Sequence, residues 1–163
     1  MSFRLIPAAV PFALAAALLF SGAGMADDGA AHDHEHSDIP FELQLNNGEK
    51  WAIDPPMGKA MGDISTAMRQ SLDAIHENRL PAEDYLPLAS QINDSVAYMV
   101  ANCDLPPEAD AQLHMIIAQL MAGSEKMASS SDASPRDGAV QVLGALDAYD
   151  QYFDDPDFAD LAH

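Results

Sequence analysis

The fold is decided by residues 98–114, which read Tyr-Met-Val-Ala-Asn-Cys-Asp-Leu-Pro-Pro-Glu-Ala-Asp-Ala-Gln-Leu-His. The stretch closes one expected helix, turns at Pro106 and Pro107, and opens the next helix. Proline is tolerated in the first turn of a helix but not in its interior. The stretch contains the only cysteine of the chain, Cys103, together with His114. We therefore expect any chemistry of the folded part to centre here.

Four segments with helical periodicity occupy residues 54–155. We expect them at about residues 54–78, at about 82–102, from the proline pair to about 127, and at about 135–153. Asp54 is the expected N-cap of the first helix, and Ser134 and Asp137 are spaced as a capping box for the fourth. Four such helices with short links predict an all-α fold, an antiparallel up-and-down four-helix bundle.

The apolar stripe of each segment predicts its buried face. The expected inner residues are Met57, Met61, Ile64, Met68, Leu72 and Ile75; then Tyr85, Leu88, Ile92, Val96, Met99 and Cys103; then Ala109, Leu113, Ile116, Ile117, Leu120 and Met127; then Ala139, Val142, Leu146, Tyr149 and Phe153. Ser124 is a small polar interruption of the third stripe. Residues 156–163 form the expected tail.

The composition limits the classes of partner. The chain has 163 residues, 48% of them apolar, which is enough to bury the core of one modest domain. Its formal net charge is -19, and it has only seven Lys and Arg residues. This charge repels the phosphates of nucleic acids and anionic lipid headgroups. Cations and basic proteins are the favoured partners.

Residues 1–26 have the composition of a signal peptide. A positive residue precedes an apolar run over residues 5–20, and small residues suit cleavage before Asp27. The run is shorter than the roughly 20 residues of a spanning helix, with an uncleaved anchor as the alternative. After cleavage we expect no stable membrane association. In an oxidising compartment, an unpaired Cys103 is buried, bonded between chains or bound to a metal.

Residues 27–40 read as a flexible arm, because they are polar and have too little apolar surface to fold. Three histidines, His32, His34 and His36, alternate there with acidic residues. Imidazoles near carboxylates suit Cu(II), Zn(II) or Ni(II). The alternative is a soluble linker without a metal.

Residues 41–53 predict a β-hairpin, with a simple extended strap as the alternative. A three-residue loop at residues 46–48 pairs Leu43 with Trp51 and keeps the apolar side chains on one face. A two-residue Asn47-Gly48 turn would instead place Trp51 opposite Gln44. The match of apolar residues favours the three-residue loop.

An antiparallel bundle brings several polarisable side chains to one end. The residues expected there are Met57, Met61, Met99, Cys103, His114, Tyr149 and Phe153. Thioether and thiolate sulfurs with one imidazole suit Cu(I). The alternative is ordinary packing, since methionine and free cysteine commonly fill cores. Cys103 and His114 also lie on opposite sides of a turn, so a joint site requires the loop to fold back.

Other chemistry has no comparable motif. The acidic residues near the carboxyl end lack the glycine and the terminal glutamate of a calcium loop. A C-x-x-C-H motif for covalent haem is missing, and the last helix offers no inward histidine, so no haem is expected. No phosphate loop, metalloprotease motif or nucleophile elbow is present in the sequence, and we expect a protein that is not an enzyme.

Three stretches carry a resemblance to a known group of proteins. Residues 101–114, the Asn-Gly-Glu-Lys-Trp of 47–51, and the Ala-Tyr to Tyr-Phe-Asp of 148–154 resemble small exported proteobacterial proteins that lack an established activity. The likeness covers about residues 45–156, and it implies a cytochrome b562-like bundle and the handling of metals, especially copper. Proteins of this kind often end in His-Pro-Gly-Trp, where this chain has Asp-Pro-Asp-Phe at 155–158.

Taken together, these patterns lead to one hypothesis and one rival. The hypothesis is a periplasmic helical bundle that binds a metal ion, copper, as a buffer or delivery protein. The arm would capture Cu(II), and the sulfur residues with His114 would offer a softer inner site. The rival is a protein-interaction module without metal, whose acidic surface and hairpin engage another periplasmic protein.

Overall fold

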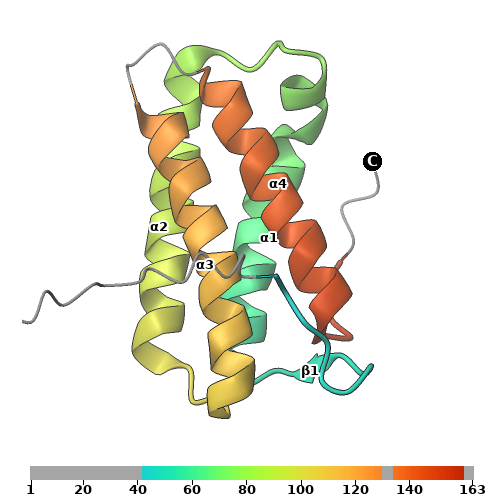
Figure 1. The fold of residues 1–163 in the computed structure, drawn as a ribbon. Coiled ribbons are helices and arrows are strands. Elements are labelled where there is room, and N and C mark those ends of the chain that lie inside the picture. Colours follow the sequence, from blue (N-terminus) through green and yellow to red (C-terminus); the bar gives the residue numbers. More distant parts are fainter. Residues whose placement is uncertain (1–41, 130–133, 160–163) are drawn as a thin grey trace, which may run out of the picture. The chain divides into compact units, whose positions relative to one another are not determined.

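The computed structural model describes residues 42–129 and 134–159, which form four helices and two short strands (Figure 1). The elements are β1 (Trp51–Ala52), α1 (Pro55–His76), α2 (Ala82–Asn102), α3 (Pro107–Ala128), α4 (Pro135–Tyr152) and β2 (Phe153–Asp154). The all-α four-helix fold is therefore confirmed. The expected signal peptide and the arm with its three histidines lie outside the described residues. Within the described ranges, no helix has the length and apolarity needed to cross a bilayer.

The helices begin where the sequence signals indicate. The Asp54 side chain caps α1 by accepting a hydrogen bond from the backbone N–H of Met57 at 2.9 Å. Prolines occupy the first turns of α1, α3 and α4, where a missing N–H costs nothing. The expected capping box of α4 is wrong, because Ser134 makes no side-chain cap. Its backbone carbonyl instead accepts the N–H of Asp137 at 2.9 Å.

The predicted inner faces form one continuous core. Nearly all of the expected residues are buried, while Leu72, Cys103 and Ile117 are only half-buried against the core. Ser124 is buried as well, and its hydroxyl is satisfied by the Asn93 side chain at 2.6 Å and the Met121 carbonyl at 3.0 Å. The polar interruption of the third stripe therefore carries no unpaired group into the core.

The predicted hairpin register is wrong. Asn46 and Glu49 exchange backbone hydrogen bonds of 2.8 and 3.0 Å across a two-residue turn, in which Asn47 and Gly48 both have positive φ angles. This is the turn that Asn-Gly favours in hairpins. Trp51 consequently lies opposite Gln44, and its indole N–H donates to the Gln44 carbonyl at 2.6 Å.

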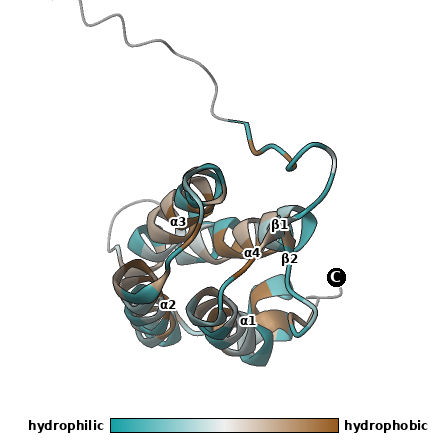
Figure 2. Cartoon of the chain, turned by 90° about the horizontal axis from the view of Figure 1, so that it is seen from below, coloured by the Kyte–Doolittle hydropathy of each residue, from teal (hydrophilic) through white to brown (hydrophobic). Residues whose placement is uncertain are grey.

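The strand partner of Trp51 comes from the other end of the chain. β1 pairs in parallel with β2, with Trp51 opposite Phe153 and Ala52 opposite Asp154. Figure 2 looks along the helices from the end of the fold at which the two strands lie side by side. The segment before α1 is thereby held to the residues that follow α4.

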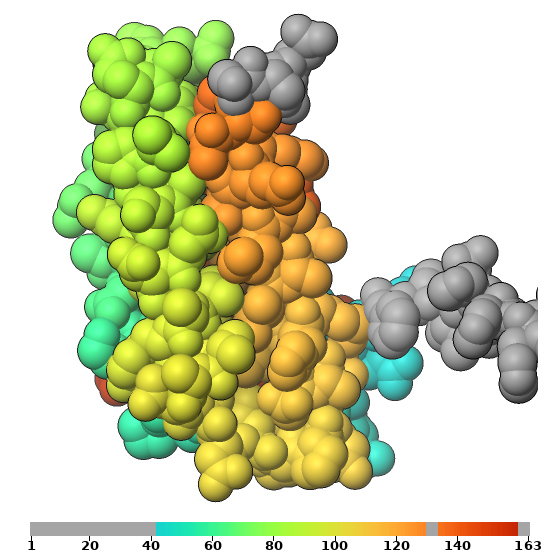
Figure 3. Space-filling model, turned by 90° about the vertical axis from the view of Figure 1, so that its left-hand side faces the viewer, coloured from blue at the N-terminus to red at the C-terminus, as the bar shows by residue number. Residues whose placement is uncertain are grey.

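Hydrogen bonds between helix ends show which ends of the helices lie together. The start of α1 meets the end of α2, since the Asp104 N–H donates to the Asp54 carboxylate at 2.7 Å. The end of α1 meets the start of α4, where the Arg136 side chain donates to the Ile75 carbonyl at 2.8 Å. Figure 3 shows α2 and α3 packed side by side along one face.

The helices α3 and α4 approach each other closely at Gly123 and Gly138. A Cβ atom on Gly138 would lie 2.5 Å from the Gly123 carbonyl oxygen and 2.8 Å from the Met127 nitrogen. A Cβ atom on Gly123 would lie 2.8 Å from the Gly138 carbonyl oxygen. Because these neighbours are backbone atoms, a side chain at either position forces the two helices apart.

We predict that Gly138→Ala lowers the free energy of unfolding by about 1–3 kcal/mol through this overpacking. Gly144→Ala is the matched control in the same helix, because its Cβ would meet no atom within 4 Å. The control should stabilise the fold by about 0.5–1 kcal/mol, since alanine favours helix over glycine. Urea denaturation followed by circular dichroism measures both. Equal effects of the two substitutions would contradict the close approach.

Candidate functional site

The Asp54 carboxylate joins two backbone groups at one end of the fold. One oxygen accepts the N–H of Met57 at 2.9 Å, and the other accepts the N–H of Asp104 at 2.7 Å. The same carboxylate acts on the neighbouring Cys103 thiol and raises its pKa. Asp54 therefore fixes the start of α1 and the end of α2 beside the only cysteine of the chain.

Three buried methionines come from the helix ends that meet at this junction. Met57, Met61 and Met99 are each 0% exposed and belong to the hydrophobic core cluster, which includes residues of all four helices. Cys103, at the C-cap of α2, is half-buried and packs against the same cluster. The predicted sulfur residues thus come from neighbouring ends of α1 and α2. Together they supply three thioethers and one thiol in apolar surroundings.

His114 lies apart from that cluster. Its side chain is 61% exposed on the outer face of α3, with Nδ1 2.9 Å from the Asp110 carbonyl oxygen and 3.4 Å from the Asp110 carboxylate. The contact with Asp110, one turn earlier, is the one that helical spacing predicts. The structure therefore places Met57, Met61, Met99 and Cys103 at neighbouring ends of α1 and α2, and it leaves His114 facing solvent.

The environment of Cys103 favours the protonated thiol. Burial is the largest cause, and together with the Asp54 carboxylate and the Asp110 charge it raises the pKa of the thiol from its ordinary 9.0 to about 12. A thiol in this setting is a weak nucleophile at neutral pH. A metal that binds the sulfur must displace this proton.

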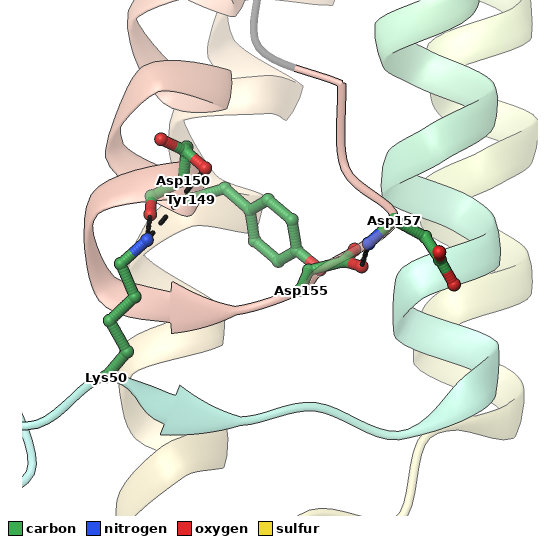
Figure 4. Close-up of polar contacts among 5 residues, drawn as sticks. All are labelled: Lys50, Tyr149, Asp150, Asp155 and Asp157. Atoms are coloured by element: carbon green, nitrogen blue, oxygen red, sulfur yellow. Dashed lines mark hydrogen bonds and ion pairs between the residues drawn. The ribbon is translucent and has the colours of Figure 1, made fainter.

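An aromatic group covers the same end of the fold. The Tyr149 ring is fully buried, stacks on Phe153 with ring centroids 5.5 Å apart, and meets Phe158 edge-on at 5.0 Å. Its hydroxyl donates to the Asp155 carboxylate at 2.7 Å, and the other Asp155 oxygen accepts the N–H of Asp157 at 3.1 Å (Figure 4). Burial and the Asp155 carboxylate raise the pKa of Tyr149, so the phenol stays neutral.

A lysine holds the segment before α1 against the end of α4. The Lys50 ammonium donates to the Asp150 carbonyl and lies 3.9 Å from the Asp150 carboxylate (Figure 4). Both side chains are nearly half exposed, so this ion pair contributes little to stability. Its effect is to fix the position of the strand pair.

The buried metal donors at this end of the fold are soft sulfur atoms. Among residues 42–129 and 134–159, no three histidine, cysteine or acidic side chains converge as a metal-binding group. Methionine sulfur is the abundant donor, with one thiol beside it. The arm histidines, which were the predicted Cu(II) ligands, lie outside the described residues.

Two site features escaped the sequence analysis. Asp54 was predicted only as a helix cap, and its hydrogen bond with Asp104 and its effect on Cys103 were not predicted. The bundle connectivity could have indicated both, because it places the N-cap of α1 beside the C-cap of α2. The Tyr149–Asp155 bond was also missed, since Asp155 follows the end of α4 and the helical period does not apply there.

No family model, curated protein or solved structure matches this chain.

We predict that native Cys103 reacts slowly with iodoacetamide at pH 8, and that its rate still climbs at pH 10 without an inflection, since the folded thiol has a pKa near 12. In urea the inflection should fall near 9. Because the folded pKa lies above the unfolded one, the stability contributed by this thiol is complete below pH 9. It is lost as the pH rises from about 9 to about 12.

Asp54→Asn keeps an oxygen that can cap α1 but removes the negative charge. This variant should alkylate faster at pH 8, by up to about tenfold for each unit by which the thiol pKa falls. Mass spectrometry of the modified protein measures the rates. A native inflection near 9 in the parent protein would contradict the role of burial and of Asp54.

Proposed function

We propose that this protein is a periplasmic metal-binding protein that buffers or delivers copper. The observation that carries the proposal is the full burial of three methionines, Met57, Met61 and Met99, at neighbouring ends of α1 and α2, with Cys103 half-buried against the same core. Soft thioether and thiolate ligands select Cu(I) over zinc and over hard cations. An apolar enclosure also protects Cu(I) from water.

The proposed ligand set suits storage and transfer better than catalysis. Thioethers are neutral, so they enter an apolar core without the cost of burying a charge. Only Cys103 must lose a proton when it binds the metal, which makes the affinity increase with pH. The periplasmic location follows from the export signal that we read in residues 1–26.

A second, outer site is part of the proposal. His32, His34 and His36 would capture Cu(II) on the arm, and the formal charge of -19 attracts cations to the molecule. His114 would take part at the surface through Nε2, because Nδ1 is engaged with Asp110.

We also infer that the helices follow an antiparallel up-and-down order. This order is supported by the bond between Asp54 and Asp104 at one end and the bond between Arg136 and Ile75 at the other. Each bond joins the start of one helix to the end of another, as short links require.

The test is a Cu(I) titration against a chromophoric chelator, using protein from residue 27 in which the three arm histidines are replaced by alanine. We expect saturable binding to the folded body. Met61→Leu and Met99→Leu should each weaken it by about tenfold or more, a loss of about 1.4 kcal/mol. Met57→Leu should do the same. Leucine keeps the volume of methionine, so the fold is retained.

Met127→Leu is the matched control. Met127 is 2% exposed in the core, but it lies near the end of α3, where its backbone approaches Gly138 at the start of α4. Its replacement should leave Cu(I) affinity unchanged. If neither Cu(I) nor Cu(II) binds the complete mature protein saturably, the copper proposal fails and the interaction module without metal takes its place.

A further inference from the structure

The chain folds back on itself after α4. Residues 153–159, here named the closing segment, run from the strand pair with β1 to a contact with α1. At its far end, the Ala159 carbonyl accepts hydrogen bonds from Arg69 at 2.7 Å and from Ser65 at 3.3 Å. The closing segment therefore lies along the first half of α1, which carries Met57 and Met61.

The methionines cannot be reached in this arrangement. Met57, Met61 and Met99 expose none of their surface, so any ligand that binds their sulfurs requires part of the structure to move. The four helices are held by the shared core, and their separation amounts to unfolding. The closing segment is seven residues long and contains no helix, and a short segment that is held by few contacts opens at a lower cost than a packed helix.

Few interactions hold the closing segment in place. They are the two-residue strand pair, the Tyr149–Asp155 hydrogen bond, the bonds to Ala159, and the packing of Phe153 and Phe158 on the core. Among these, the Tyr149 hydroxyl is the one polar tie between the helical core and the middle of the closing segment. Its removal should loosen the segment while leaving the helices packed.

A groove runs between the closing segment and α1. It has a volume of about 660 Å³, and Gly58 and Gly62 of α1 are among its lining residues. A Cβ atom on Gly58 would lie 3.0 Å from the Ile53 side chain and 3.5 Å from the Asp155 carboxylate, which shows how closely the segment approaches. The two glycines leave their positions on this face of α1 without side chains, and each stands one position along the helix from a buried methionine, Met57 or Met61.

The groove has the charge of an entrance for cations. The carboxylates of Asp54, Asp63, Asp155 and Asp157 line it, and the one ammonium that lines it, Lys59, is bonded to Asp63 at 2.6 Å. Carboxylates on both sides of the groove attract a positive ion and raise its local concentration. They also repel one another across the groove, which weakens the closed state.

We propose that the closing segment is a latch over the buried methionines Met57, Met61 and Met99, and that it opens as a unit to admit Cu(I) through the acidic groove. The identity of the ion rests on the proposed function. The opening itself does not, because it is a property of the protein without metal.

The test replaces Tyr149 by phenylalanine and measures the oxidation of each methionine by hydrogen peroxide, without copper, using peptide mass spectrometry. The variant keeps the buried ring but loses the bond to Asp155. Met57 and Met61 should oxidise about tenfold faster, because their reaction follows the open population. Met127, which is buried near the carboxyl end of α3, should keep its oxidation rate. Tyr152→Phe, one turn further along α4, is the matched control and should change nothing.

A parallel rise at Met127 would show global unfolding and overturn the latch, as would unchanged oxidation of Met57 and Met61. The rate of Cu(I) uptake supplies the second readout. It should rise in Tyr149→Phe by the same factor as the oxidation, since both depend on the same opening. Faster oxidation with unchanged uptake would overturn the role as a gate. If every variant fails to bind Cu(I) but the oxidation pattern holds, the proposed function fails and the opening stands.

Discussion

One carboxylate, that of Asp54, holds together the end of the molecule on which the proposed chemistry depends. It caps α1 through Met57, accepts the N–H of Asp104 just beyond α2, and helps to raise the pKa of the Cys103 thiol. A cap of this kind contributes about 0.5–2 kcal/mol to a helix. Here the same side chain also fixes the distance between two helices and keeps the thiol protonated. Helix capping, helix pairing and thiol chemistry are therefore coupled through one residue.

Residues that are distant in the sequence also hold this end of the fold together. β1 and β2 pair although they stand near opposite ends of the described sequence, and the hydroxyl of the buried Tyr149 joins α4 to the closing segment through Asp155. The methionine side chains are fully buried in the core, while the groove between α1 and the closing segment is lined by carboxylates. An ion is thus attracted by carboxylates and, in our proposal, retained by sulfur.

The helices could be predicted because their signals are local. Proline pairs and the Asp54 cap indicated helix starts, and the apolar stripes identified nearly all of the core. The predicted bounds of α2 agree with the observed Ala82–Asn102. The hairpin register was wrong because it was chosen to match Leu43 with Trp51, although the local Asn47-Gly48 pair favours the two-residue turn that the chain adopts. The strand partner of Trp51 is Phe153, and no local pattern indicates a pairing over that distance. Connectivity predicted that methionines and Cys103 share one end, whereas the outward orientation of His114 depends on the exact rotation of α3.

The central claim is that buried sulfur at this end of the bundle is a Cu(I) site. X-ray absorption at the copper edge tests it most directly, on protein loaded with one equivalent of Cu(I) and lacking the three arm histidines. The account predicts a first coordination shell composed of sulfur alone, which shrinks when Met61 or Met99 is replaced by leucine. A shell of nitrogen and oxygen, unchanged by those replacements, would contradict it.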